Sequence, residues 1–212
     1  IAEAHTALGM IAAWEYDWPR AEREHRRALE LNPASAHCRD WYAHYFLLQM
    51  GRLEEAAEEF QRALELDPLS LLIQSHIALP FYPRRQYHLV IQQSQRVLKL
   101  SPEYALAHWF IGIASIGAGL LDGAVSALET ANVLTGRTAF TMMGLGLAYA
   151  RAGRASKARE LLEELIERSQ TSYVSPVNPG WIYMGLGETD KAFECFDKAV
   201  EDHSPLMTFF HL

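Results

Sequence analysis

The feature that most constrains the fold is a repeat with a period of 34 residues. One position, expected to be a turn, recurs as Gly51, Arg85, Gly119, Gly153 and Gly187. Five residues later a small-residue position recurs as Ala56, Val90, Ala124, Ala158 and Ala192, and a bulky position recurs as Phe60, Ser94, Leu128, Leu162 and Phe196. Units that recur at such a spacing bury their apolar faces against their neighbours. The chain is therefore predicted to be a stack of repeated supersecondary units.

Each unit has the pattern of two helices joined by the turn. Before the turn, a second set of mostly small residues recurs as His44, Ala78, Gly112, Gly146 and Gly180. After the second helix, pairs such as Asp67-Pro68 and Ser101-Pro102 end one helix and begin the next. A first copy, shifted by one residue, begins with Leu8 and Gly9 and ends at Asn32-Pro33.

The pattern predicts an all-α chain of about six antiparallel hairpins in a single domain, residues 1–212. The expected hairpins cover roughly 1–33, 34–68, 69–102, 103–136, 137–170 and 174–204, and an apolar tail follows at 205–212. Because the chain begins in mid-pattern without an initiator methionine, we expect a piece of a longer protein.

Two segments interrupt the repeat. In the third copy, Pro80 and Pro83 predict an early end of the first helix. They either widen the spacing of the neighbouring hairpins, with Arg84 and Arg85 facing solvent, or simply stop the helix. Residues 167–180 are polar and contain prolines, so the sixth hairpin is predicted to have a short first helix that begins near 176–179.

The tail is apolar although it follows the last hairpin. Its large side chains are Leu206, Met207, Phe209, Phe210 and Leu212. A terminal repeat needs a polar outer face. We therefore expect the tail to cover the last helix, residues 189–202, or to enter the groove of a neighbouring molecule.

Composition excludes several classes of function. The net charge is −7, and the basic stripe that neutralises phosphates is missing, so we expect no nucleic-acid partner. The apolar segment 105–121 is at the lower length limit for a membrane span, but it lies in register with less apolar segments on both sides. We expect it to be a buried helix and predict no membrane insertion.

No motif indicates catalysis or a cofactor. The chain lacks a Gly-x-Ser-x-Gly elbow, a phosphate-binding loop and a His-Glu-x-x-His pair. His37 and His44 flank Cys38, but their spacing is wider than zinc sites favour, and no second ligand pair is evident. His25 occupies the bulky position of the first copy, which packing explains. We predict that the segment is not an enzyme and binds neither a cofactor nor a metal.

With these repeated Gly, Ala, bulky and Pro positions, the hairpins resemble tetratricopeptide repeats over almost the whole chain. The resemblance implies a right-handed superhelical solenoid. The sequence WYAHYFLLQMGRLEEAAEEFQRALELDPLS also resembles tetratricopeptide regions fused to bacterial winged-helix regulators and serine/threonine kinases. That resemblance implies a regulatory module of a larger bacterial signalling protein, in the cytoplasm or on a membrane-anchored parent.

In such repeats the first helices line the concave face, where a partner binds. Carried onto this sequence, the expected partner-binding residues are Trp41, Tyr45, Leu48, Leu79, Tyr82, Trp109, Ile113, Met143, Leu147, Trp181 and Met184. This apolar set predicts binding of a protein, as an apolar peptide or an amphipathic helix. Two alternatives stay open: the side chains pack between neighbouring helices, or the groove takes the chain's own tail or another copy in a structural homo-oligomer.

Overall fold

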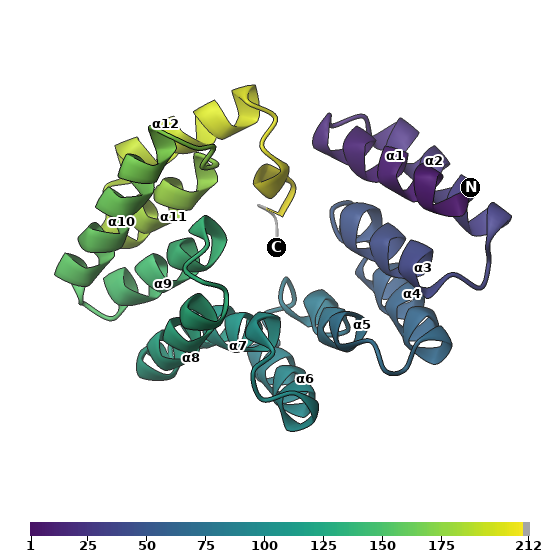
Figure 1. Cartoon of the computed structure of the whole chain (residues 1–212), viewed down its shortest axis with the longest axis horizontal. Coiled ribbons are helices and arrows are strands. Elements are labelled where there is room, and N and C mark those ends of the chain that lie inside the picture. The colour runs from purple at the N-terminus through teal and green to yellow at the C-terminus, as the bar shows by residue number, and fades with distance from the viewer. Residues whose placement is uncertain (210–212) are drawn as a thin grey trace. The chain divides into compact units, whose positions relative to one another are not determined.

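The structure is a computed structural model that describes the backbone of residues 1–209 and the side chains of residues 1–207. Within residues 1–209 it has twelve α-helices and no β-strand. The predicted all-α fold of about six helical hairpins is confirmed. Its contacts divide the chain into two compact units, Ile1–Gln86 (unit 1) and Tyr87–Met207 (unit 2). The division falls within the third expected hairpin. Figure 1 shows the helices coloured along the chain from the N-terminus to the C-terminus.

Unit 1 holds two complete hairpins and part of a third. The first hairpin is α1 (Ala2–Trp14) and α2 (Trp18–Leu31). The second begins with α3 (Ala36–Tyr42), which continues as a π-helix, η1 (Ala43–Leu47), and it is completed by α4 (Leu53–Leu66). Next come α5 (Leu71–His76) and the short 3₁₀-helix η2 (Leu79–Phe81).

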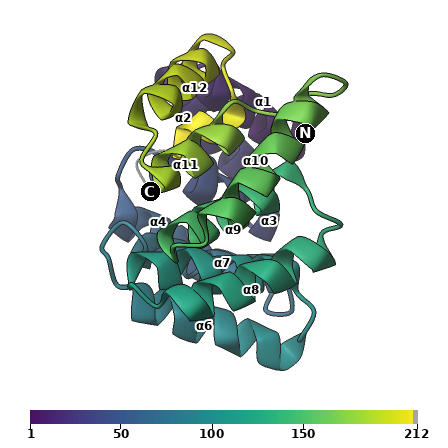
Figure 2. The same ribbon diagram turned by 90° about the vertical axis from the view of Figure 1, so that its left-hand side faces the viewer.

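Unit 2 begins with α6 (Tyr87–Leu100) and continues with three hairpins. These are α7 (Ala105–Gly117) with α8 (Leu121–Leu134), α9 (Ala139–Arg151) with α10 (Ala155–Ser169), and α11 (Val177–Leu186) with α12 (Thr189–Glu201). The 3₁₀-helix η3 (Pro205–Phe209) follows. Figure 2 turns α9 to α12 toward the viewer. The first helices also contact one another, because α9 packs on both α7 and α11.

The turn position has the same backbone geometry in each copy. Gly51, Arg85, Gly119, Gly153 and Gly187 all have positive φ angles, from 56° at Arg85 to 78° at Gly187. The residue after the turn closes a Schellman motif: the Arg52 amide donates to the Leu47 carbonyl at 2.9 Å, and the Arg154 amide to the Tyr149 carbonyl at 2.8 Å. Tyr16, with φ 59°, takes this place in the shifted first copy. The period of 34 residues therefore reflects one recurring helix end.

The repeated positions on the second helices form the core. All five residues of the small-residue position and all five of the bulky position are buried, including the polar Ser94. The first helices approach them closely because they carry glycine: a Cβ added at Gly112 would collide with Leu128, and one at Gly180 with Phe196. At Gly9, an added Cβ would lie 2.7 Å from the His25 ring. In these three copies the glycine of the first helix and the bulky position of the second helix are thus the two sides of one contact.

The third copy is interrupted as the prolines predict. Helix α5 ends at His76, four residues before Pro80, and no continuous helix runs from Leu71 to Arg85. Arg85 is exposed, as expected. The expectation for Arg84 was wrong: its side chain is half-buried and forms an ion pair with Glu54 at 2.5 Å. The pair forms because Glu54, in the first turn of α4, faces this loop.

The sixth hairpin has the predicted short first helix. Helix α11 begins at Val177 and has 10 residues, whereas α9 has 13. In the tail, Leu206 and Met207 are half-buried. The expected contacts of Phe209, Phe210 and Leu212 lie outside the described side chains, so the docking of the tail stays a prediction.

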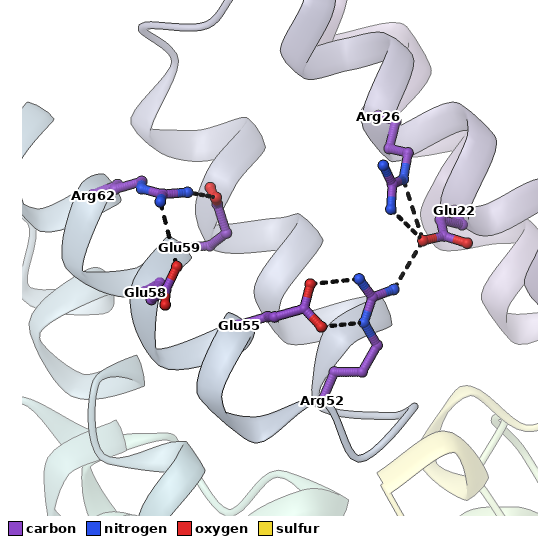
Figure 3. Close-up of polar contacts among 7 residues, drawn as sticks. All are labelled: Glu22, Arg26, Arg52, Glu55, Glu58, Glu59 and Arg62. Atoms are coloured by element: carbon purple, nitrogen blue, oxygen red, sulfur yellow. Dashed lines mark hydrogen bonds and ion pairs between the residues drawn. The ribbon is translucent and has the colours of Figure 1, made fainter.

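Ion pairs join neighbouring hairpins in unit 1. Arg52, directly after the turn, bonds Glu22 of α2 at 2.8 Å and Glu55 of α4 at 2.5 Å, and Glu22 also accepts from Arg26 (Figure 3). The hydrogen bond from Arg52 is the main reason that the pKa of Glu22 lies below its usual value. These groups are partly or fully exposed, so solvent screens the pairs and each contributes little to stability. The Arg52–Glu22 pair links the start of α4 to α2 of the preceding hairpin.

Candidate functional site: aromatic side chains on the first helices

The predicted partner-binding residues differ in burial. Leu48, Leu79 and Met143 are 1%, 9% and 8% exposed. Because these three side chains are buried, they belong to the packed interior and leave the candidate site. The other eight are half-buried: Trp41, Tyr45, Tyr82, Trp109, Ile113, Leu147, Trp181 and Met184.

Unit 1 brings four rings together, which we call the aromatic cluster: Trp14, His37, Trp41 and Tyr45. Their ring centroids lie 4.6 Å apart for His37 and Trp41, 5.1 Å for Trp41 and Tyr45, and 6.3 Å for Trp14 and Tyr45. Three of the rings lie four residues apart, which places them on one face of α3 and η1. Our sequence reasoning missed Trp14 and His37, although the four-residue spacing before Trp41 was a signal for His37.

The π-helix explains how these rings are presented. Gly51 lies 16 positions after the helix-capping Ser35, whereas Gly153 lies 15 positions after the corresponding Thr138. The first helix of the second hairpin therefore contains one extra residue, and η1 accommodates it. This insertion is the source of the one-residue shift of the first copy. Single-turn π-helices of this kind are frequent at functional sites.

A polar group lies behind the aromatic cluster. His76 of α5 and Asp40 of α3 are both buried, and Nδ1 of His76 lies 2.9 Å from a carboxylate oxygen of Asp40. The ring of His44 lies 4.5 Å from that of His76 and 4.7 Å from that of Tyr45. Burial, and then the neighbouring His76, holds the pKa of His44 well below its usual value, so His44 is neutral at physiological pH.

The polar group is structural in its geometry. It joins successive first helices, α3 and α5, and orients the face that carries Tyr45. Burial, followed by the charge of Asp40, raises the pKa of Tyr45, which keeps its hydroxyl protonated at neutral pH. Within the described residues, no group of three or more His, Cys, Asp or Glu side chains is arranged to hold a metal ion.

In unit 2 the predicted residues pack between helices. The ring of Trp109 stacks on that of Phe140, with centroids 4.5 Å apart. The indole nitrogen of Trp109 and the side chain of Ile113 both lie against Gly144 of α9. Leu147 lies against Gly185 of α11. These contacts favour the packing alternative for Trp109, Ile113 and Leu147. Trp181 lies with its ring 5.9 Å from that of Phe196.

The apolar segment 105–121 is mostly α7, which has 13 residues. Among the helices of residues 1–209, none has the length and apolar character needed to span a bilayer.

Models of the tetratricopeptide repeat match three segments of the chain, residues 42–68, 140–172 and 178–201. The first lies in unit 1 and the other two lie in unit 2. A curated relative, the protein O-mannosyl-transferase Tmtc1 of Drosophila melanogaster, is 34% identical over 87 residues. That match spans 41% of this chain but only 10% of the relative.

Solved structures share the fold at low sequence identity. A tetratricopeptide repeat protein from Parabacteroides merdae aligns with a TM-score of 0.69 at 17% identity, over 97% of this chain and 82% of its own. PilW, a type IV pilus biogenesis factor, aligns at 0.65 and 19% identity over 81% and 79%. A thermophilic TPR protein of Thermus thermophilus aligns at 0.64 and 21% identity over 81% and 92%. These structures show the same fold, and the matched family models place tetratricopeptide repeats in both units of the chain.

Proposed function

We propose that this segment is a non-catalytic scaffold that binds an apolar peptide or amphipathic helix of a partner protein through the aromatic cluster of unit 1. Tetratricopeptide proteins generally mediate protein–protein interaction, and such scaffolds are generally non-catalytic. The observation that supports this particular site is the set of contacting rings on one surface of the first helices: the half-buried Trp14, Trp41 and Tyr45 and the exposed His37.

Two physical arguments favour the aromatic cluster over the other predicted residues. Large aromatic side chains dominate the energy of protein interfaces when they are held in a packed surround. Here the rings already contact one another, and the Asp40–His76 pair holds the helices beneath them, so little side-chain entropy is lost on binding. In unit 2, by contrast, Trp109 is engaged by Phe140 and Gly144.

The test uses a peptide selected from a phage-displayed random library on the full chain and then synthesised with a fluorescent label. Trp41→Ala should weaken its binding by about 2 kcal/mol, or roughly thirtyfold, while the melting temperature changes little. Trp18→Ala is the matched control, because Trp18 is a half-buried tryptophan at the start of a second helix. Equal losses in both variants, or a large drop in the melting temperature of Trp41→Ala, would contradict the site.

The finer assignment, a regulatory module of a larger bacterial signalling protein, is supported by the sequence pattern of the second hairpin. The sequence of the full-length gene product tests it: a winged-helix or kinase domain is the expected result. Sedimentation of the same chain tests the alternative of a homo-oligomeric module, for which the sedimenting mass should rise with concentration in the absence of any peptide.

A further inference from the structure

The outer face of α12, the last second helix within residues 1–209, is apolar and acidic, and it is exposed. Phe193 is 55% exposed and Val200 is 47% exposed. Asp190 and Asp197 are also exposed, three residues before each of them. These four positions lie on one side of the helix because their spacing of three and four residues follows the helical repeat. We call them the α12 face.

The same four positions are occupied in α8, two repeats earlier, by Asp122, Val125, Glu129 and Asn132. There they form the contact with the next hairpin. Val125 and Asn132 are each 2% exposed. The acidic pair is bonded by the following helix and its turn: the hydroxyl of Tyr149 donates to Glu129 at 2.7 Å, and Arg154 pairs with Asp122 at 2.8 Å.

The α12 face therefore repeats an interface whose other side is known from within the chain. Both carboxylates are retained, as Asp190 for Asp122 and Asp197 for Glu129. The two central positions become more apolar, with Phe193 in place of Val125 and Val200 in place of Asn132. The residues that directly follow α12 form η3, and they leave Phe193 and Val200 exposed.

We propose that the α12 face binds an amphipathic helix of another protein. The chemistry of this partner helix is that of α9. It has apolar residues along one side, a hydroxyl donor such as tyrosine near its C-terminal end, and an arginine five residues after that donor, beyond the turn. The arginine pairs with Asp190, the hydroxyl group bonds Asp197, and the apolar side covers Phe193 and Val200. This site is separate from the aromatic cluster and does not depend on it.

A second copy of this chain is a poorer occupant. Its first helix, α1, does present Leu8 and Ile11, which are 37% and 40% exposed. However, the position after its turn, where Arg154 stands in α9, is Asp17, and the position of Tyr149 is Ala12. Docking α1 would set one carboxylate against Asp190 and give Asp197 no donor, which like-charge repulsion disfavours.

The probe is a fluorescently labelled peptide with the sequence of residues 137–154, which includes α9 and Arg154. Added to the full chain, it should bind saturably, with anisotropy as the readout. Phe193→Asp and Asp190→Lys in the chain should each weaken binding by roughly tenfold or more. Glu194→Lys is the matched charge control, because the equivalent position in α8, Ser126, stays exposed, and it should leave binding unchanged.

A charge exchange makes the assignment specific. The peptide with Arg154→Glu should bind the unaltered chain weakly and should regain affinity for the Asp190→Lys chain. Circular dichroism of each variant confirms that the chain is folded. Absence of saturable binding, binding unaffected by Phe193→Asp, or failure of the exchange would overturn the proposal. Self-association of the chain that Phe193→Asp abolishes would also overturn it, because the occupant would then be a second copy.

Discussion

At the scale of single residues, His25 is the most unusual member of the core. It is fully buried in the bulky position of the first copy, between Gly9 and the ring of Tyr42. Neither ring nitrogen has a hydrogen-bond partner among the described residues. Burial lowers the pKa of His25 from 6.5 to about 4. The neutral imidazole therefore packs as an apolar ring. In four of the other five copies the same position is occupied by leucine or phenylalanine.

The lowered pKa predicts how stability depends on pH. Between pH 6.5 and 4 the unfolded chain binds a proton at His25, whereas His25 stays neutral in the folded chain. The contribution of His25 to the free energy of unfolding is therefore complete above pH 6.5 and is lost as the pH falls toward 4. The loss amounts to about 3 kcal/mol by pH 4. His25→Leu should remove this part of the dependence. Urea unfolding of both proteins at pH 7 and pH 4.5 measures the change in the free energy of unfolding between the two pH values. The same change in the wild-type and His25→Leu proteins would contradict the burial of a neutral ring.

At the scale of elements, the turns were the most predictable part of the chain. Their positive φ angles restrict the residue type, so glycine marks four of the five turns that keep the strict period.

The π-helix was not predictable. The extra residue appeared in the sequence only as a shift of the first copy, because nothing in AHYFL distinguishes a π-helix from an α-helix. The pairing of Arg84 with Glu54 was missed for a similar reason, since a loop conformation decides it.

Arg85 is the exception among these turns and provides a prediction. Its φ of 56° places a Cβ close to the following carbonyl, which costs about 1 kcal/mol for a residue other than glycine. Arg85→Gly should therefore stabilise the chain by up to about 1 kcal/mol, reduced by the greater flexibility of glycine in the unfolded state. Gly153→Ala, at the equivalent position with φ 73°, should have the opposite sign. Thermal unfolding of the two variants checks this, and a destabilised Arg85→Gly protein would show that the arginine side chain contributes more than the strain removes.

At the scale of the whole molecule, the fold was predictable and the binding surface much less so. Buried positions repeat because each hairpin meets the same neighbouring surface, and five copies of a pattern outweigh the irregularity of any one. A binding face has no such redundancy. The apolar residues of the first helices serve both packing and recognition, and only contacts such as Trp109 on Phe140 distinguish the two. The open α12 face was also hidden, because Phe193 and Val200 follow the same helical pattern as buried residues.

Repeated hairpins also predict that damage stays local. In unit 2 the first helix α7 contacts α6, α8 and α9, and an added methyl group at Gly112 would collide with Leu128 of α8. Gly112→Ala should therefore cost about 1–3 kcal/mol. Because stability in such arrays is a sum of nearest-neighbour terms, the loss should appear first in the hairpin that contains the change.

Hydrogen exchange of the full chain measures where the loss falls. In Gly112→Ala, amide exchange should accelerate in α7, α8 and α9, while α12 keeps its protection, because it packs on α11 rather than on the altered pair. Gly123→Ala is the matched control: an added methyl group there meets no atom within 4 Å, and alanine should stabilise α8 by about 0.5–1 kcal/mol. A uniform increase in exchange across α7 to α12 would instead mean that unit 2 unfolds as one cooperative body, and nearest-neighbour coupling would then be the wrong account of its stability.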